Sequence, residues 1–215
     1  MIEDHWPLFG LRLHTPRLEL RLPGLDDLAR LADVAAGGVH DPGRQPFTTP
    51  WTDGTPAEAA RSTLQWHWAT LGRWTPADWT LNLITLAEGR VIGTQALDGK
   101  QFATLREAGT GSWLGQPWQG QGYGKEMRAA ILELAFTGLG AEYATSEAFA
   151  DNAASYGVSR ALGYADDGIS RHVVRGGAVV GRRLRLDRAT WESTRTVEVE
   201  ISGLEPCLPL FGLEV

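Results

Sequence analysis

The segment QGQGYGKE, residues 119–126, is the strongest local signal in this sequence. It places glycines at 120, 122 and 124, between a short apolar stretch and a segment of helical periodicity. Glycine has no Cβ and adopts positive φ freely, so the backbone can turn tightly and approach a ligand closely. Successive N–H groups then converge on one point, and the start of the next helix adds partial positive charge. The segment therefore predicts a loop that binds a pyrophosphate.

The residues alone leave other interpretations of this loop open. The simplest is a tight turn without a ligand. A dinucleotide-binding loop requires strands that alternate with helices and an acidic residue at the tip of the next strand. Glu142 has the right separation but begins its strand, and the strands predicted before the loop form a hairpin. A P-loop requires a hydroxyl after Lys125 to bind Mg²⁺, and Glu126 stands there instead.

Composition limits the fold and the partners. The chain has 215 residues, of which 43% are hydrophobic and 21% charged, which suits one domain over residues 1–215. The net charge of −6 argues against nucleic acid as a partner, because phosphate contacts require clustered Lys and Arg. The tail, residues 203–215, is apolar and contains proline. We expect it to lie against the body or against a second copy of the chain, which leaves a homodimer open.

The single cysteine, Cys207, excludes an internal disulfide and argues against a cysteine-based metal site. The first ten residues, MIEDHWPLFG, lack the basic and apolar regions of a signal peptide. No apolar run approaches the roughly 20 residues of a membrane span. We therefore expect a cytoplasmic protein with no membrane partner and no metal.

Periodicity and turn residues divide the chain into short elements. The predicted strands are 11–22, 79–87, 90–97, 109–115, 142–149, 169–175, 178–186 and 195–201. The predicted helices are 23–38, 57–71, 125–137 and 153–162, with a helical turn at 188–192. This order predicts an α/β (α+β) fold, with one mixed sheet and helices packed on it.

Two blocks of the sequence resemble the GNAT superfamily of N-acetyltransferases. Gln119-x-x-Gly122-x-Gly124 is similar to its central motif, Q/R-x-x-G-x-G/A. Asn152-Ala-Ala-Ser155, followed by Leu162-Gly163-Tyr164, is similar to the N-x-x-S and LGF signature of the RimJ/RimL branch. That branch modifies protein N-terminal amines and related amino groups.

Two weaker blocks extend the resemblance over roughly residues 13–191. Residues 13–21, LHTPRLELR, are similar to the opening strand of the branch, and residues 183–191 to its closing strand and turn. The resemblance implies a GNAT fold, with a mostly antiparallel sheet of about 6–8 strands that splays at the coenzyme A site.

The resemblance also implies which residues bind acyl-CoA. The strand before the loop would pair with the pantetheine arm through the backbone of Trp113 and Leu114. Asn152 would contact the pantetheine or cap the next helix, or do both. The pyrophosphate would be held by the backbone of Gln119, Gly120, Gln121, Gly122, Tyr123, Gly124 and Lys125.

Ser155 matches the position at which this branch places a hydroxyl near the sulfur of CoA. Its implied role is the general acid that protonates the leaving thiolate, a step that contributes about 10²–10⁴-fold. The opposing interpretation is a hydroxyl that bonds back within its helix. At position +7 from Asn152, where the wider family often has a tyrosine, this chain has Ser159.

The general base is open on the sequence alone. A Lys amine must lose a proton at a cost of about 4 kcal/mol at pH 7.4, whereas an α-amine needs little help. The candidates are Glu147, His67, His172 and Asp53, and a water relay is a further option.

The acceptor pocket is expected between the loop and helix at 40–71, the hairpin near 81–97 and the strand pair at 170–182, where Phe47, Trp51 and Trp66 gather, with Glu147 as a further candidate. Five of the nine tryptophans fall between 51 and 79, as core residues or as an aromatic wall around a ligand. The acceptor would be a primary amine of a small molecule or of a protein N-terminus. The donor would be acetyl-CoA or another acyl-CoA such as succinyl-CoA, which an Arg or Lys facing the thioester would indicate.

Two other functions compete with N-acyl transfer. One is a protein of the same fold that binds acyl-CoA as a sensor and performs no chemistry. The other is a nicotinamide-dependent oxidoreductase, which follows from the dinucleotide interpretation of the loop.

Overall fold

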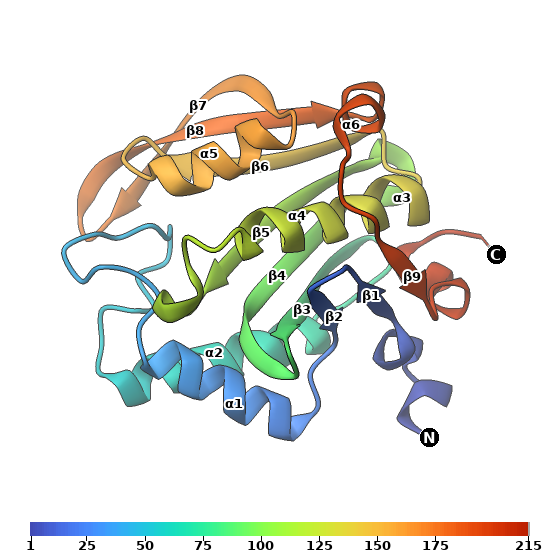
Figure 1. Ribbon diagram of the computed structural model, residues 1–215, viewed down its shortest axis with the longest axis horizontal. Helices are drawn as coiled ribbons and strands as arrows, with labels where there is room; N and C mark the ends of the chain where they lie inside the picture. The colour runs from blue at the N-terminus through green and yellow to red at the C-terminus, as the bar shows by residue number, and fades with distance from the viewer. Residues whose placement is uncertain (215) are drawn as a thin grey trace.

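The computed structural model describes residues 1–214. One mixed sheet runs through the molecule in the order β7-β8-β6-β5-β4-β3-β2-β1-β9 (Figure 1). Every neighbouring pair is antiparallel except β5 and β6, which are parallel. Nine strands are one more than the upper end of the expected range. They are β1 (Arg12–His14), β2 (Leu18–Arg21), β3 (Asp78–Ala87), β4 (Arg90–Lys100), β5 (Glu107–Leu114), β6 (Tyr143–Phe149), β7 (Ala165–Val174), β8 (Gly177–Asp187) and β9 (Glu200–Ser202).

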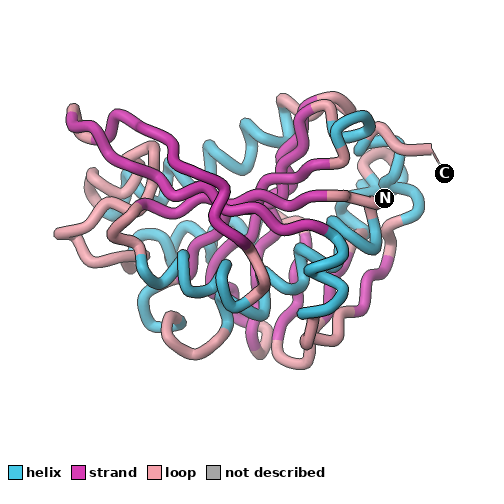
Figure 2. Tube along the Cα trace, turned by 90° about the horizontal axis from the view of Figure 1, so that it is seen from above, coloured by secondary structure: helices cyan, strands magenta, loops and turns pink. Residues whose placement is uncertain are grey.

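Helices cover both faces of this sheet, as Figure 2 shows. Neighbouring residues of β3 show which helix lies on which face, because side chains alternate along a strand. Ile84 packs with Leu31 of α1, and Thr85 contacts Met127 of α4. The helices are α1 (Leu25–Ala36), α2 (Pro56–Gly72), α3 (Phe102–Leu105), α4 (Tyr123–Glu133), α5 (Ala153–Ala161) and α6 (Arg188–Thr194). No helix in residues 1–214 has the length and apolarity that a bilayer crossing requires.

The prediction of one strand over 11–22 is wrong, because the chain reverses in the middle of this segment. Pro16 cannot donate to a sheet ladder, and the turn around it is closed by Thr15. The Thr15 N–H donates to the Leu18 carbonyl at 2.9 Å, and the Leu18 N–H donates to Thr15 Oγ1 at 3.0 Å. The two halves pair as the antiparallel strands β1 and β2.

Two hairpin turns follow from local residue chemistry. The turn at Glu88-Gly89, which has positive φ at both residues, joins β3 to β4 as predicted. The turn between β7 and β8 lies at Arg175-Gly176, one residue before the predicted Gly176-Gly177, because Val174 pairs with Gly177.

The C-terminal segment differs most from the prediction. The expected strand 195–201 is reduced to β9, which pairs with β1 at the sheet edge. The tail forms a 3-10 helix, Glu205–Phe211, on the body of the protein. Trp74 Nε1 donates to the Leu210 carbonyl at 2.8 Å, and the rings of Trp79 and Phe211 pack with centroids 4.9 Å apart. The apolar tail therefore lies against the body of the protein.

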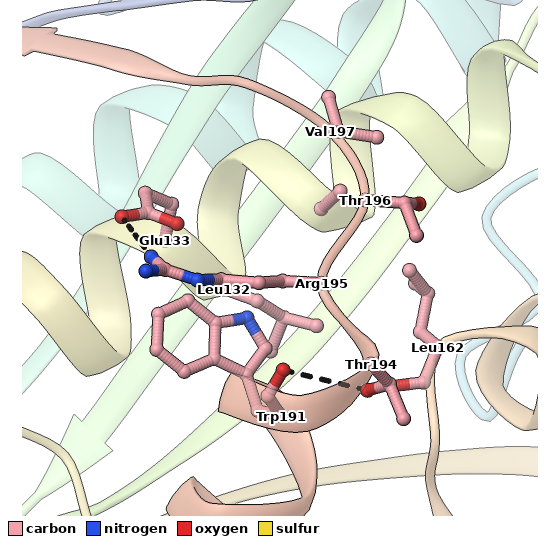
Figure 3. A pocket seen from close by; sticks show the side chains of 9 residues that line it. Leu132, Glu133, Leu162, Trp191, Thr194, Arg195, Thr196 and Val197 are labelled. Carbon is pink, nitrogen blue, oxygen red and sulfur yellow. Dashed lines mark hydrogen bonds and ion pairs between the residues drawn. The ribbon is translucent and has the colours of Figure 1, made fainter.

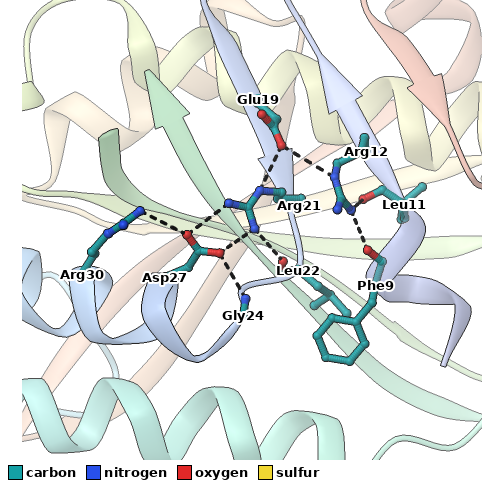
Figure 4. Close-up of polar contacts among 9 residues, drawn as sticks. All are labelled: Phe9, Leu11, Arg12, Glu19, Arg21, Leu22, Gly24, Asp27 and Arg30. Carbon is teal, nitrogen blue, oxygen red and sulfur yellow. Dashed lines mark hydrogen bonds and ion pairs between the residues drawn. The ribbon is translucent and has the colours of Figure 1, made fainter. Parts of the chain in front are cut away.

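A cluster of ion pairs joins β2 to the start of α1 (Figure 4). Arg21 donates to Asp27 through both Nη atoms, at 2.5 and 3.1 Å, and its Nε lies 3.0 Å from Glu19. Burial raises the pKa of Asp27, but the hydrogen bonds from Arg21 and from the Gly24 N–H outweigh it and lower the pKa overall. This pair links β2 to the first turn of α1.

Candidate active site

The parallel strands β5 and β6 separate part of the way along their length. They pair only where 107–109 meet 143–145. Beyond that point β5 continues to Leu114 beside β4, and β6 continues to Phe149 beside β8. Beyond this point the backbones of β5 and β6 are therefore not paired with each other. This separation, the β5–β6 split, is the expected splay.

The glycine loop lies at the end of β5 and leads into α4. Gly120 and Gly122 have φ of +73° and +84°, which only glycine adopts at little cost. The N–H groups of residues 120–124 have no hydrogen-bond partner within residues 1–214. Those of Gln119 and Lys125 donate to Gln116 and Gly122, at 3.2 and 3.1 Å. Five of the seven expected donors are thus available, at the N-terminus of a helix of 11 residues.

Arg17, which precedes β2, supports this loop from the side. It donates to the Gln121 carbonyl at 3.1 Å and lies over the Tyr123 ring, 4.6 Å from its centroid. Its charge is paired with Glu126, which accepts from Arg17 Nε and from Thr15 Oγ1, each at 2.6 Å. Glu126 is buried, so this pair attaches the first turn of α4 to the start of β2.

The Gln119 side chain connects the loop to the other side of the site. Its Nε2 donates to the Leu114 carbonyl at 2.8 Å and to the Val39 carbonyl at 2.7 Å. Val39 begins the long segment between α1 and α2, which carries Phe47 and Trp51. The Gln119 side chain therefore links the glycine loop to this segment through hydrogen bonds.

Asn152 and Ser155 lie at the start of α5, immediately after β6. Asn152 Oδ1 caps the helix by accepting the Ser155 N–H at 3.1 Å, so one of its two expected roles is confirmed. The Ser155 hydroxyl is partly exposed and has no protein hydrogen-bond partner in the described part of the chain. It does not bond back within its helix, and it is free to donate to a ligand.

Glu147 lies on the opposite face of β6 from Ser146, which faces α4. Its carboxylate pairs with His172 Nε2 of β7, and Ser170 Oγ lies 3.0 Å from the same nitrogen. Both contacts use Nε2, so this is not a Ser-His-carboxylate relay, which requires both ring nitrogens. A Cβ on Gly181 of the intervening strand β8 would come within 2.0 Å of the carboxylate, so only glycine leaves room for this contact.

Aromatic side chains line the same face of the sheet. The ring centroids of Phe47 and Trp51 are 5.2 Å apart, and those of Trp51 and Trp113 are 5.6 Å apart. Three of the residues expected near the site are thus brought together. Trp66 lies elsewhere, half exposed on α2 beside Arg73. The Trp-rich segment divides accordingly, because Trp74 and Trp79 pack in the core.

The remaining base candidates occupy structural positions. His67 is buried on α2, and burial lowers its pKa to about 4, so it is neutral and inaccessible to a substrate. Asp53 makes two hydrogen bonds with Arg175, which lower its pKa, and it joins the 40–55 segment to the β7–β8 turn. Glu147 and His172 are the candidates left, and of the two only Glu147 lies on a strand that borders the split.

Two hollows differ in what they could hold. The first, between α4 and α6, has a volume of about 10 Å³ and is closed by the Glu133–Arg195 ion pair (Figure 3), so it admits at most one water. The second is an open groove of about 380 Å³ beside the 40–55 segment. Its lining includes Gln45, Asp151, Arg175 and Val180. No group of three or more His, Cys, Asp or Glu side chains in residues 1–214 could hold a metal.

Sequence reasoning assigned no role to Arg17, Gly181 or Arg128. Arg128 is 4% exposed and reaches the β5–β6 split from α4. Its one available signal was its place in the helix, since it lies four residues before the buried Leu132 and so belongs to the face that meets the sheet. A charged residue on such a face is unusual enough to be noticed.

Comparison with known proteins agrees with this geometry. The acetyltransferase (GNAT) domain family matches residues 17–165. The chain therefore belongs to the GNAT family of acetyltransferases, and its class is that of an acyl-CoA-dependent N-acetyltransferase. Acetyl-CoA is the co-substrate of this class.

Solved structures show the same fold at low sequence identity. Mycobacterium smegmatis RimJ in complex with CoA-disulfide has a TM-score of 0.69 at 17% identity, over 85% of this chain and 90% of that one. RimL, a ribosomal L7/L12 alpha-N-protein acetyltransferase in complex with coenzyme A, has a TM-score of 0.65 at 15% identity, over 80% and 95%. Ribosomal-protein-S5-alanine acetyltransferase from Vibrio fischeri has a TM-score of 0.64 at 16% identity, over 84% and 98%.

Proposed function

We propose that this protein transfers a short acyl group from acyl-CoA to a primary amine by direct attack in a ternary complex. The observation that carries the proposal is the β5–β6 split. The free N–H groups of residues 120–124 and the Ser155 hydroxyl lie on its α4 and α5 side. Glu147 and Trp113 face the α1 side. Donor and acceptor can therefore approach the same opening from opposite faces of the sheet.

On the donor side, the backbone of Trp113 and Leu114 on the free edge of β5 would pair with the pantetheine arm as an added strand does. The amides of Gly120 to Gly124 would hold the pyrophosphate. Each contact of a helix N-terminus with an anion contributes about 0.3–1 kcal/mol, so several together give useful affinity in an acidic protein. Arg17, whose charge is paired with Glu126, holds the loop in place beside them through the Gln121 carbonyl.

Ser155 is proposed as the general acid. The amine nitrogen attacks the thioester carbonyl carbon, the C–S bond breaks, and the sulfur takes the hydroxyl proton of Ser155, which solvent water replaces. A thiol has a pKa near 8.5, so its thiolate is already a fair leaving group. We therefore expect Ser155 to contribute at the lower end of the range for general acids, about 100-fold.

Glu147 is proposed as the general base. It would accept the proton that the amine loses, directly or through a water molecule, while His172 fixes the orientation of the carboxylate. The arrangement suits an amine that is cationic in solution, because a carboxylate both attracts the cation and removes its proton.

The acceptor would lie between the aromatic side chains of Phe47 and Trp51 and the groove near Arg175. The aromatic wall favours an amine that carries an apolar group, and the open groove leaves room for either a small molecule or a protein N-terminus. RimL acts on a protein α-amine, as its name states. N-terminal peptides are therefore among the acceptors to be tested with this protein.

A thiol-release screen tests the proposal. Acyl-CoA is incubated with a panel of small amines and N-terminal peptides, and free CoA is measured. Release that depends on an amine is the expected result. Tight CoA binding without release on any amine would favour the alternative, a non-catalytic acyl-CoA sensor. Thermal stabilisation by NADH and not by CoA would exclude both.

A further inference from the structure

Arg128 places a buried positive charge at the β5–β6 split. Its side chain extends from α4 to three neighbouring strands and is 4% exposed. Nη1 donates to Ser146 Oγ at 3.1 Å, Nη2 to Ser112 Oγ at 3.0 Å, and Nε lies 3.5 Å from Gln95 Oε1. Ser146 is the first residue of β6 beyond its pairing with β5, so the guanidinium lies where the two strands separate.

None of these partners neutralises the charge. Within residues 1–214, no carboxylate oxygen lies within 4 Å of Arg128. The nearby Tyr164 is a neutral phenol, because burial raises its pKa more than Arg128 lowers it. A buried charge without a counter-ion costs several kcal/mol, and buried charges in proteins are as a rule paired with an opposite charge. An anion that enters the split would supply it here.

The unused hydrogen-bonding capacity of Arg128 limits what that anion can be. A guanidinium has five N–H donors, and the three contacts above use three of them. One N–H on each Nη remains for the Tyr164 phenol, which also bonds the guanidinium, or for a ligand that displaces it. Two such donors match the two oxygens of a carboxylate, which Arg binds in a bidentate manner. The pyrophosphate is held elsewhere, at residues 120–124, so the anion at Arg128 belongs to the acyl end of the donor.

We propose that Arg128 determines donor specificity by pairing with the terminal carboxylate of a dicarboxylic acyl-CoA such as succinyl-CoA. The proposal rests on the N-acyltransferase function above. The thioester carbon bonds to the amine nitrogen, the C–S bond breaks, and one proton passes from the amine to the base and one from the acid to sulfur. The distal carboxylate keeps its charge throughout, so its pairing with Arg128 contributes to binding and orientation. Acetyl-CoA fills the same split and leaves the charge unpaired.

The test compares succinyl-CoA with acetyl-CoA in binding and in turnover. By calorimetry, the wild-type protein is expected to bind succinyl-CoA at least about tenfold tighter than acetyl-CoA, since one charge-assisted pair contributes that much or more. In Arg128→Met, the affinity for succinyl-CoA should fall about 100-fold and that for acetyl-CoA should stay within about threefold. Arg128→Lys keeps the charge but loses the bidentate geometry of the guanidinium, so its affinity for succinyl-CoA should lie between those of the wild-type protein and Arg128→Met. Arg90→Met removes an exposed arginine at the β3–β4 turn and should change neither.

The outcomes separate this proposal from the function on which it rests. Equal affinity of the wild-type protein for both donors would overturn the role of Arg128, even if acetyl-CoA turns over. An equal loss of kcat with both donors in Arg128→Met, without a change in KM, would also overturn it, because that pattern indicates stabilisation of the reacting oxygen. Selective binding of succinyl-CoA without any thiol release would support Arg128 and refute catalysis. Circular dichroism and thermal unfolding check that each variant is folded, and Arg128→Lys serves if Arg128→Met is not.

Discussion

Glu147 on β6 reaches His172 on β7 across the intervening strand β8, and it can do so because residue 181 of β8 has no side chain. A Cβ at this position would come within 2.0 Å of Glu147 Oε1 and 2.6 Å of Ser170 Oγ. The proposed base thus depends on three strands in register, with Gly181 paired to Phe149 on one side and to Ser170 on the other.

Gly181→Ala should disconnect this pair without touching a substrate. The methyl group must displace the carboxylate, so we expect kcat to fall, while the affinity for CoA is unchanged. Glu147→Gln should lower kcat by about 10²–10⁴-fold, as loss of a general base does. Steady-state kinetics with a saturating amine measures both. Gly177→Ala, on the same strand with only ordinary contacts around its Cβ, is the matched control. Wild-type kcat in both Gly181→Ala and Glu147→Gln would remove Glu147 from the mechanism.

Ser155→Ala should lower kcat about 100-fold and leave the Kd for CoA within about twofold. The hydroxyl has no protein partner whose loss would destabilise the fold, and the helix cap uses the Ser155 N–H and not its side chain. Calorimetric titration with CoA beside turnover measurements gives both numbers. Ser193→Ala, on the exposed side of α6, is the control. Unchanged turnover would mean that the thiolate leaves without a proton from this residue.

Gly122→Val should abolish CoA binding. At φ of +84° a β-branched residue is strained, and its Cβ would lie 3.3 Å from Arg17 Nη2. The loop must then change shape, and the five free N–H groups no longer converge. The expected loss is at least about 100-fold in Kd, since several amide contacts go together. Gly72→Ala, where nothing lies within 4 Å of the new Cβ, should bind normally. Normal CoA affinity in Gly122→Val would contradict the role of the loop.

Much of this architecture followed from the sequence because it depends on local chemistry. Gly120 and Gly122 need positive φ, and Asn152 suits a helix cap, so loop and helix could be predicted from neighbouring residues. The site could not be predicted to the same depth. The role of Gly181 depends on Glu147, which lies 34 positions earlier. The role of Arg128 depends on two serines, on strands that become neighbours only in the folded protein. The reversal at Pro16 was missed because the alternating pattern continues on both sides of it.

Acid should destabilise the protein through His67. Burial lowers its pKa to about 4, whereas in the unfolded chain it titrates near 6.5. The stability is complete above pH 6.5 and is lost as the pH falls toward 4, because the unfolded state then binds a proton that the folded state does not. Between pH 7.5 and pH 5 the loss is about 2 kcal/mol. Urea unfolding at both pH values should show this loss in the wild-type protein and in His14→Gln, whose histidine is exposed, and a much smaller one in His67→Leu. The same pH dependence in His67→Leu would place the titrating group elsewhere.

Cys207 should be silent in thiol assays. It is fully buried, and burial raises the pKa of its thiol to about 11, so only about 0.1% is thiolate at pH 8. A disulfide reagent should detect no protein thiol in the folded state and one equivalent after denaturation. Rapid labelling of the native protein would show that the tail, Glu205–Phe211, opens in solution. If labelling is absent, released CoA can be read directly without a Cys207 variant.

The two hydrogen bonds of the Gln119 side chain have a kinetic consequence. They join the end of β5 to Val39, near the start of the segment that carries Phe47 and Trp51. Occupying the loop with a pyrophosphate should therefore also order the wall against which the amine docks. The two substrates would then add in a compulsory sequence, with acyl-CoA first and CoA leaving last. In product inhibition, CoA would compete with acyl-CoA but not with the amine, and Gln119→Leu would relax this order.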